Sequence, residues 1–224
     1  MADAITSTTN ARVKEIVSLR KRRERDRTGL FVIEGTRELA KAAEASVELI
    51  ETFWCAELAS PAGEALLSEV EATPMSTEAF AKASYRDRPD GVLAIARQFD
   101  VALASLEVAP NSVLLAIESV EKPGNLGTML RTALAAGAAA VISADPGTDI
   151  FNPNVIRASL GAVFAVPLAV TDTATAIAWL TSRDFGIYST TPAGDVEPWS
   201  VDLASAAAIA VGSEASGLSL PWRR

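Results

Sequence analysis

Short apolar segments alternate with helical segments throughout the second half of the chain, and this alternation most constrains its fold. The apolar segments are 113–117, 139–143, 162–166, 186–189 and 207–211. The main helical segments of this half are 126–137, 154–160 and 173–181. Strands that alternate with helices in this way build a parallel sheet that helices cover on both faces. We therefore predict an α/β domain with a parallel sheet over residues 109–224.

The first half of the chain has the same two kinds of segment in a less regular order. Helical patterns cover 8–23, 36–45, 62–70 and 77–83, and strand-like runs cover 30–33, 49–55 and 91–96. The stretch 98–111 carries Pro110 and few strong signals of either kind, which is typical of a connection between domains. We predict a smaller, separate α/β domain over residues 1–108.

The amino-acid composition excludes several classes of chemistry. The chain has no histidine and one cysteine, Cys55, which rules out Ser-His-Asp and Cys-His catalysis, a structural zinc cluster and an internal disulfide. We therefore expect no metal centre, and any catalysis must use other side chains or a cofactor. No apolar run approaches the roughly 18 residues that span a membrane, and no secretory signal is visible. These features predict a cytoplasmic protein.

The charge of the chain is unevenly distributed. Its net charge is −8, yet residues 12–27 hold eight basic and three acidic side chains, a surplus of five positive charges. Such a block is either a surface that binds phosphate groups or an ordinary solvated helix face, and the sequence leaves both interpretations open. The basic side chains are Arg12, Lys14, Arg20, Lys21, Arg22, Arg23, Arg25 and Arg27.

A polar loop with glycines follows the first apolar segment of the predicted parallel sheet. It runs from Glu118 into a helix that carries Asn125, Gly127 and Arg131. Ligands bind at the edge of a parallel sheet where its strands end, so this loop is a candidate site. It is neither a Walker A loop nor a dinucleotide-binding G-x-G-x-x-G loop. Asn125 also suits the N-cap of the helix, and Arg131 also suits a surface ion pair.

Two further motifs lie in the later part of the chain. The last apolar segment leads into G-S-E-A-S-G-L-S over residues 212–219. Its glycines allow the backbone to line a pocket, and its Glu214 can orient a partner. The alternative interpretation of this motif is a plain turn. The helical segment 154–160 carries Arg157, which suits either a phosphate contact or a cation at the helix C-terminus.

The order and separation of these motifs resemble one family. The elements N-x-G-x-x-x-R from residue 125, R-x-S-x-G-x-x-F from residue 157 and G-S-E-x-x-G-L-S from residue 212 resemble the SpoU (TrmH-like) branch of the SPOUT RNA 2′-O-methyltransferases. Residues 7–14 and 31–35 resemble the substrate-binding domain, similar to ribosomal protein L30e, that these enzymes often carry. The resemblance covers nearly the whole chain.

The resemblance implies an activity, an assembly and a set of site residues. The activity is S-adenosylmethionine-dependent 2′-O-ribose methylation of RNA, with 23S ribosomal RNA expected ahead of tRNA, by a homodimer whose catalytic domain forms a trefoil knot. The implied catalytic residues are Arg131, near the target ribose, with Asn125 and Glu214 beside it. The implied cofactor contacts are Gly212, Thr190 and Leu218. Together with the basic block, the resemblance gives as RNA contacts Arg12, Lys14, Arg20, Arg22, Arg23 and Arg157.

One part of the family pattern is missing from the sequence. Family members continue beyond the Gly-Ser-Glu loop into a third motif with Ser-Leu-Asn-Val and a further helix, whereas this sequence stops at P-W-R-R. We expect that the sequence is trimmed, because a knotted domain without that helix leaves an apolar sheet face uncovered. Two alternatives stay open: a non-catalytic RNA-binding protein that keeps the fold, and a nucleotide-binding α/β enzyme of another class. The absence of Walker A and dinucleotide motifs argues against the second.

Overall fold

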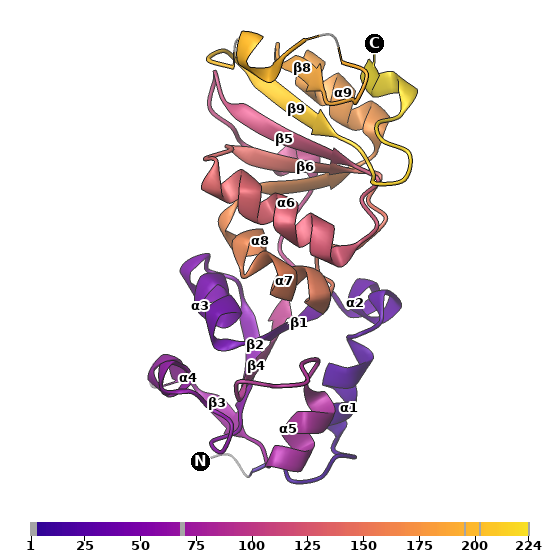
Figure 1. Ribbon diagram of the computed structural model, residues 1–224. Coiled ribbons are helices and arrows are strands. Elements are labelled where there is room, and N and C mark those ends of the chain that lie inside the picture. The colour runs from indigo at the N-terminus through magenta and orange to yellow at the C-terminus, as the bar shows by residue number, and fades with distance from the viewer. Residues whose placement is uncertain (1–3, 68–69, 195, 202, 224) are drawn as a thin grey trace. The chain divides into compact units, whose positions relative to one another are not determined.

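The computed structural model describes residues 4–67, 70–194, 196–201 and 203–223 (Figure 1). The chain folds into two compact units, and each unit contains two separate segments of the sequence. The first unit comprises Met1–Phe99 and Asp149–Ala165, and the second comprises Asp100–Thr148 and Val166–Arg224. The chain therefore passes from one unit to the other three times.

A four-stranded sheet forms the centre of the first unit. It contains β1 (Leu30–Glu34), β2 (Leu49–Trp54), β3 (Ala72–Pro74) and β4 (Val92–Arg97), in the order β1-β4-β2-β3. β4 is antiparallel to β1 and β2, and the short β3, which the sequence patterns did not indicate, is parallel to β2. The helices from the first half of the chain are α1 (Ala11–Ser18), α2 (Arg22–Thr28), α3 (Thr36–Glu44), α4 (Pro61–Leu67) and α5 (Thr77–Ala83). Residues 68 and 69, the predicted continuation of α4, lie outside the described residues.

The prediction of one helix over 8–23 is wrong, because the structure has α1 and α2 with a turn between them. The backbone carbonyls of Leu19 and Arg20 in this turn accept hydrogen bonds from the guanidinium of Arg25. α2 then ends at Gly29, whose φ of +66° is the left-handed conformation that glycine adopts without strain. A bond from a side chain to the backbone thus stabilises a break that the apolar spacing does not reveal.

Two helices that follow β6 in the sequence belong to the first unit. They are α7 (Pro153–Ser159) and α8 (Ala162–Ala165). The predicted strand 162–166 is therefore wrong, since this run forms α8. Leu160 and Gly161 have φ values of +53° and +83° and turn the chain from one helix into the next. Periodicity alone does not distinguish a strand from a buried helix in an apolar run this short.

Four phenylalanine rings anchor this segment to the first unit. The ring centroid of Phe151 lies 5.0 Å from those of both Phe31 and Phe99, and the ring of Phe164 lies 6.2 Å from both. These separations fall in the range in which aromatic pairs attract beyond simple burial. The segment 149–165 is therefore part of the core of the first unit.

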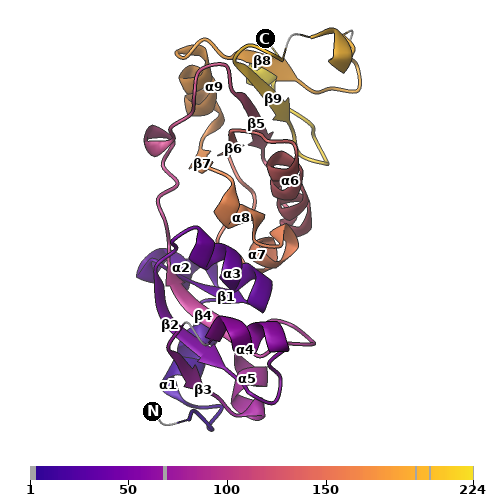
Figure 2. The ribbon, with the colours of Figure 1, turned by 90° about the vertical axis from the view of Figure 1, so that its left-hand side faces the viewer.

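The second unit contains a five-stranded sheet in which every strand pair is parallel, so the predicted fold class is confirmed. The strand order is β7-β6-β5-β9-β8. Helices α6 and α9 lie on opposite faces of this sheet (Figures 1 and 2). The elements are β5 (Val113–Glu118), α6 (Pro123–Ala135), β6 (Ala140–Ala144), β7 (Leu168–Thr171), α9 (Thr173–Thr181), β8 (Gly186–Ser189) and β9 (Ala207–Val211), with short 3-10 helices at Leu103–Ser105, Pro198–Ser200 and Leu220–Arg223.

The helices of both units are short. α6, with 13 residues, is the longest helix that the structure describes. Within the described part of the chain, no helix combines the length and the hydrophobicity that crossing a membrane requires.

Candidate active site

The strand order creates a switch point between β5 and β9. From β5 the chain continues to β6 and β7 on one side of the sheet, whereas β8 lies on the other side beside β9. β5 and β9 are parallel, and Ile117 near the end of β5 pairs with Val211 at the end of β9. The loops that follow these strands therefore start side by side. Open parallel sheets bind ligands at such a point, outside the carboxyl ends of the strands.

A contact between Asn125 and Glu214 joins these two loops. The Asn125 side-chain amide donates a hydrogen bond to the Glu214 carboxylate. The hydrogen bond from the backbone N–H of Glu214, followed by the one from Asn125, lowers the pKa of Glu214 below its ordinary value of 4.5. The carboxylate is therefore ionised near neutral pH and accepts from the amide as a charge-assisted partner.

The suggestion that Asn125 caps the helix is wrong. α6 begins at Pro123, and the N-cap position belongs to Lys122. Proline suits the first helical position, because its missing N–H has no partner there in any case and its φ already fits a helix. Asn125 consequently lies inside the first turn, where its side chain reaches Glu214.

Arg131 lies six residues further along α6, and its side chain is half-buried. Its Nη2 donates to Oγ1 of Thr128 at 3.2 Å, and the Thr128 hydroxyl donates to the Gly124 carbonyl at 2.9 Å. Its guanidinium is thus held against the first turns of α6. The structure places Arg131 on the same helix as Asn125, within the unit that holds Glu214.

The loop over 212–219 is closed by backbone contacts at its base. A Cβ added to Gly212 would lie 2.0 Å from the carbonyl carbon of Gly217, so only glycine fits there. The N–H of Gly217, whose φ is +65°, donates to the Ser213 carbonyl at 2.9 Å. The side chain of Leu218 is buried in the core of the second unit. The backbone of Leu218, rather than its side chain, is therefore suited to contact a ligand.

Glu118 is a buried residue at this edge to which the sequence analysis gave no role. Its Oε2 accepts from the Ser219 N–H, and its Oε1 accepts from the hydroxyls of Ser219 and Thr173, at 2.6, 2.6 and 2.7 Å. Burial acts to raise the pKa of Glu118, but these hydrogen bonds outweigh it and the pKa is lowered. The ionised carboxylate therefore ties β5 to the end of the 212–219 loop and to the start of α9. The sequence feature that could have revealed Glu118 is a carboxylate at the end of an apolar strand.

Thr190 directly follows β8 and lies on the wall of a cavity of about 450 Å³. Its hydroxyl donates to the Ala210 carbonyl at 2.9 Å. The wall combines apolar and hydroxyl groups, including those of Tyr188, Ser189, Thr190, Val196, Leu203 and Ile209. The volume of the cavity lies within the range of small-molecule sites.

The predicted RNA contacts divide into two groups. Arg12, Lys14, Arg22, Arg23 and Arg157 are exposed. Arg12 pairs with Glu15 and Glu51 at 2.7 and 3.0 Å, and Arg22 lies 3.6 Å from Asp26. Arg20 is exposed as well, but it also donates to three backbone carbonyls at the end of α5 and stacks over Tyr85, which gives it a structural contact. The basic block is therefore only partly a solvated face.

Two family models match the chain. The MRM3-like substrate binding domain matches residues 10–94, and the SpoU rRNA Methylase family matches residues 112–224. The 23S rRNA (guanosine(2553)-2'-O)-methyltransferase RlmP of Bacillus subtilis (strain 168) is 28% identical over 96% of this chain and 84% of its own length. In the described residues, no group of three or more Cys, Asp and Glu side chains is arranged to hold a metal ion.

Solved structures are similar over both units. An RNA 2'-O ribose methyltransferase shares 36% identity over 99% of this chain and 86% of its own, with a TM-score of 0.88. The AdoMet bound rRNA methyltransferase from Sinorhizobium meliloti shares 28% identity over 100% of this chain and 85% of its own, with a TM-score of 0.87. The family resemblance predicted from the motifs is therefore confirmed, and the chain belongs to the SpoU rRNA Methylase family.

Proposed function

We propose that this chain methylates the 2′-oxygen of a ribose in RNA with S-adenosylmethionine as methyl donor, and that 23S ribosomal RNA is its substrate ahead of tRNA. The hydrogen bond between Asn125 and Glu214 carries the proposal, because it joins two motifs 89 positions apart at the switch point of a parallel sheet. The names of relatives, among them RlmP, support the choice of 23S ribosomal RNA. A ribosomal RNA substrate implies that the protein acts in the cytoplasm.

The chemistry assigns a role to each of the three residues. A ribose 2′-hydroxyl is a weak acid, so its attack on a methyl group needs orientation and stabilisation of the developing negative charge. S-adenosylmethionine, when bound, supplies the activated methyl group. A guanidinium is a poor proton acceptor, so Arg131 orients and stabilises the 2′-oxygen rather than removing its proton. Asn125 and Glu214 keep the loops beside α6 in place.

The residues near β8 and β9 fit the proposed cofactor. The cavity beside Thr190 has room for a nucleoside, with apolar side chains for a base and hydroxyls for a ribose. Gly212 allows the backbone of the 212–219 loop to pack closely, which leaves peptide groups of this loop available to a ligand. We assign cofactor contacts to Thr190, Gly212 and the backbone of Leu218.

We further propose that residues 1–108 bind the RNA and that residues 109–224 form the methyltransferase domain with its trefoil knot.

We also propose that the protein acts as a homodimer. Light scattering of the complete protein at micromolar concentration should give twice the mass of one chain. A single-chain mass under these conditions would contradict this assembly.

The test of the function is a methylation assay with 23S ribosomal RNA transcripts and labelled S-adenosylmethionine. Arg131→Ala should lower turnover by on the order of 100- to 1000-fold, because it removes charge stabilisation made in the transition state. The affinity for S-adenosylmethionine, measured by calorimetry, should stay nearly unchanged. Arg131→Lys should not restore activity, because an ammonium lacks the planar fork of guanidinium.

Arg183→Ala is the matched control, since Arg183 is an exposed arginine of the same unit that stacks on Trp179. It should keep wild-type turnover. Wild-type turnover of Arg131→Ala would remove Arg131 from the site. RNA binding without any methyl transfer by the wild-type protein would favour the alternative of a non-catalytic RNA-binding protein.

A further inference from the structure

The segment 149–165 has a position that the proposed function does not explain. It lies within the SpoU rRNA Methylase match, yet it packs into the unit that holds the substrate-binding match. α7 of this segment and the basic helix α2 both pack against β1. The two helices therefore share a support within one compact unit.

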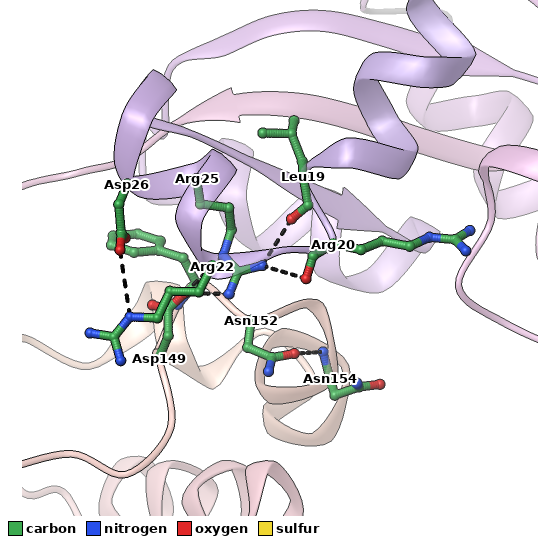
Figure 3. Close-up of polar contacts among 9 residues, drawn as sticks. Leu19, Arg20, Arg22, Arg25, Asp26, Asp149, Asn152 and Asn154 are labelled. Carbon is green, nitrogen blue, oxygen red and sulfur yellow. Dashed lines mark hydrogen bonds and ion pairs between the residues drawn. The ribbon is translucent and has the colours of Figure 1, made fainter.

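A buried ion pair joins α2 to the residues that precede α7 (Figure 3). Nε and Nη2 of Arg25 donate to Oδ2 of Asp149 at 2.8 and 2.6 Å, and the two side chains are only 2% and 11% exposed. Nη1 donates to the Leu19 and Arg20 carbonyls at 2.8 and 3.0 Å. One guanidinium thus fixes the turn before α2 and the entry to α7, which the single ammonium of lysine cannot do.

Asp149 also shapes the turn that leads into α7. Its Oδ1 accepts from the Phe151 N–H at 2.9 Å, and its carbonyl accepts from the Asn152 N–H at 3.0 Å. The Phe151 ring is held in the aromatic cluster with Phe31. The Asn152 side chain accepts from the Asn154 N–H at 2.9 Å, where α7 begins. The contacts of Asp149 therefore set where α7 starts relative to α2.

Basic and polar side chains stay exposed on both helices. Arg22 and Arg25 are three residues apart, so they lie on the same side of α2, and Figure 3 shows Arg22 paired with Asp26. On α7, Arg157 donates to Oδ1 of Asn154 at 3.4 Å, and both side chains are exposed. Arg23 is exposed on α2 as well. Arg25 is buried against Asp149, whereas Arg22, Arg23 and Arg157 are exposed, with Arg22 3.6 Å from Asp26.

We propose that α2 and α7 form one surface that binds the RNA sugar-phosphate backbone, with Arg22, Arg23 and Arg157 as its phosphate contacts. The pair Arg25–Asp149 positions the two helices for this contact. α2 holds four arginines and two acidic residues, and α7 adds Arg157 without an acidic residue, so the two helices carry a surplus of three positive charges. In a chain with net charge −8, such a local surplus favours a polyanion as the occupant. The inference rests on the proposed function only in taking RNA as the substrate.

The first test measures RNA affinity over a series of salt concentrations, with an in vitro transcript of 23S ribosomal RNA. Each lost phosphate contact should lower the slope of log K against log salt by about 0.7 to 0.9. Arg157→Ala and Arg22→Ala should each do so. Arg97→Ala is the control and should keep the slope, since Arg97 is an exposed arginine of the same unit that pairs with Glu48. An unchanged slope for Arg157→Ala would exclude α7 from the surface.

The second test addresses the positioning role of the ion pair. Arg25→Met combined with Asp149→Leu removes both charges, so no unpaired buried charge remains to unfold the protein. Arg22→Ala should weaken RNA binding several-fold in the wild type and hardly at all in this double variant. An equal effect in both backgrounds would make the pair purely structural. Binding is measured without methyl transfer, so an inactive protein with these dependencies would refute the proposed function and keep the surface.

Discussion

At the scale of single residues, Gly212 has the tightest surroundings at the base of the 212–219 loop. Gly212→Ala would place a methyl group against the Gly217 backbone. Because that backbone cannot move as a side chain does, we expect a loss of about 1–3 kcal/mol in the free energy of unfolding, with weaker binding of S-adenosylmethionine. Urea denaturation and calorimetry measure the two effects.

Gly124→Ala is the control for that prediction. A Cβ at Gly124 would meet no atom within 4 Å, and Gly124 lies in the first turn of α6. The substitution should leave stability unchanged or raise it by up to about 1 kcal/mol, since alanine favours a helix more than glycine does. Equal stability of the two alanine variants would contradict the packing argument.

We predict that Glu118 makes the stability of the protein depend on pH. Its pKa is lower in the folded protein than the ordinary 4.5, so its carboxylate stabilises the fold above that pH and this contribution is lost as the pH falls through the folded value. Glu118→Gln should lower the unfolding free energy near neutral pH. Its stability should also fall less than that of the wild type between about pH 5 and about pH 3.

Thermal denaturation across this pH range checks the prediction. Glu121→Gln changes an exposed carboxylate in the same loop and serves as the control, with the wild-type pH profile expected. If Glu118→Gln and the wild type lost stability in parallel below pH 5, the bonds from Ser219 and Thr173 would not depend on the charge of Glu118.

At the scale of elements, Arg20 connects the turn after α1 to the end of α5. Its Nη2 donates to the carbonyls of residues 82, 83 and 84 at 3.1, 3.1 and 2.6 Å. These are C-terminal carbonyls that the helix itself leaves without donors. Arg20→Ala should therefore lower the unfolding free energy by about 1–3 kcal/mol.

Arg23→Ala is the matched substitution on α2, because Arg23 is exposed. It should change stability by no more than about 0.5 kcal/mol and should weaken RNA binding. Thermal unfolding of both variants separates the structural arginine from the proposed phosphate contact. Unchanged stability of Arg20→Ala would show that these hydrogen bonds do not stabilise the fold.

At the scale of the whole molecule, the first unit depends on residues from the second half of the chain. A fragment of residues 1–108 lacks Asp149, Phe151 and Phe164, which leaves Arg25 without its carboxylate and exposes Phe31. We expect this fragment to unfold with a low urea m-value and to bind an apolar dye. Fusing residues 149–165 to its end through a flexible linker should restore cooperative unfolding. A fragment that unfolds cooperatively by itself would show that the segment is dispensable.

Local periodicity is sufficient to predict most of the helices and strands. The predicted segments 173–181, 186–189 and 207–211 have the same bounds as α9, β8 and β9. Spacing within a segment reports which face it buries, and burial of that face is what stabilises a helix or a strand. The motifs around residues 125 and 212 also indicated the family and the two residues, Asn125 and Glu214, that the fold joins.

Other features were decided by contacts between segments that are distant in the sequence. Asn125 binds Glu214 instead of capping α6, and Glu118 is held by Ser219 and Thr173. The run 162–166 contains a helix instead of a strand, because its apolar side chains meet the first unit.

The sequence by itself therefore determined the parallel α/β fold and the family, since both depend on local spacing and on short motifs. Only the tertiary structure assigned α7 and α8 to the first unit and paired Arg25 with Asp149. The physical reason is that a buried charge requires a partner wherever the folded chain brings one, and sequence distance does not limit which residue that is.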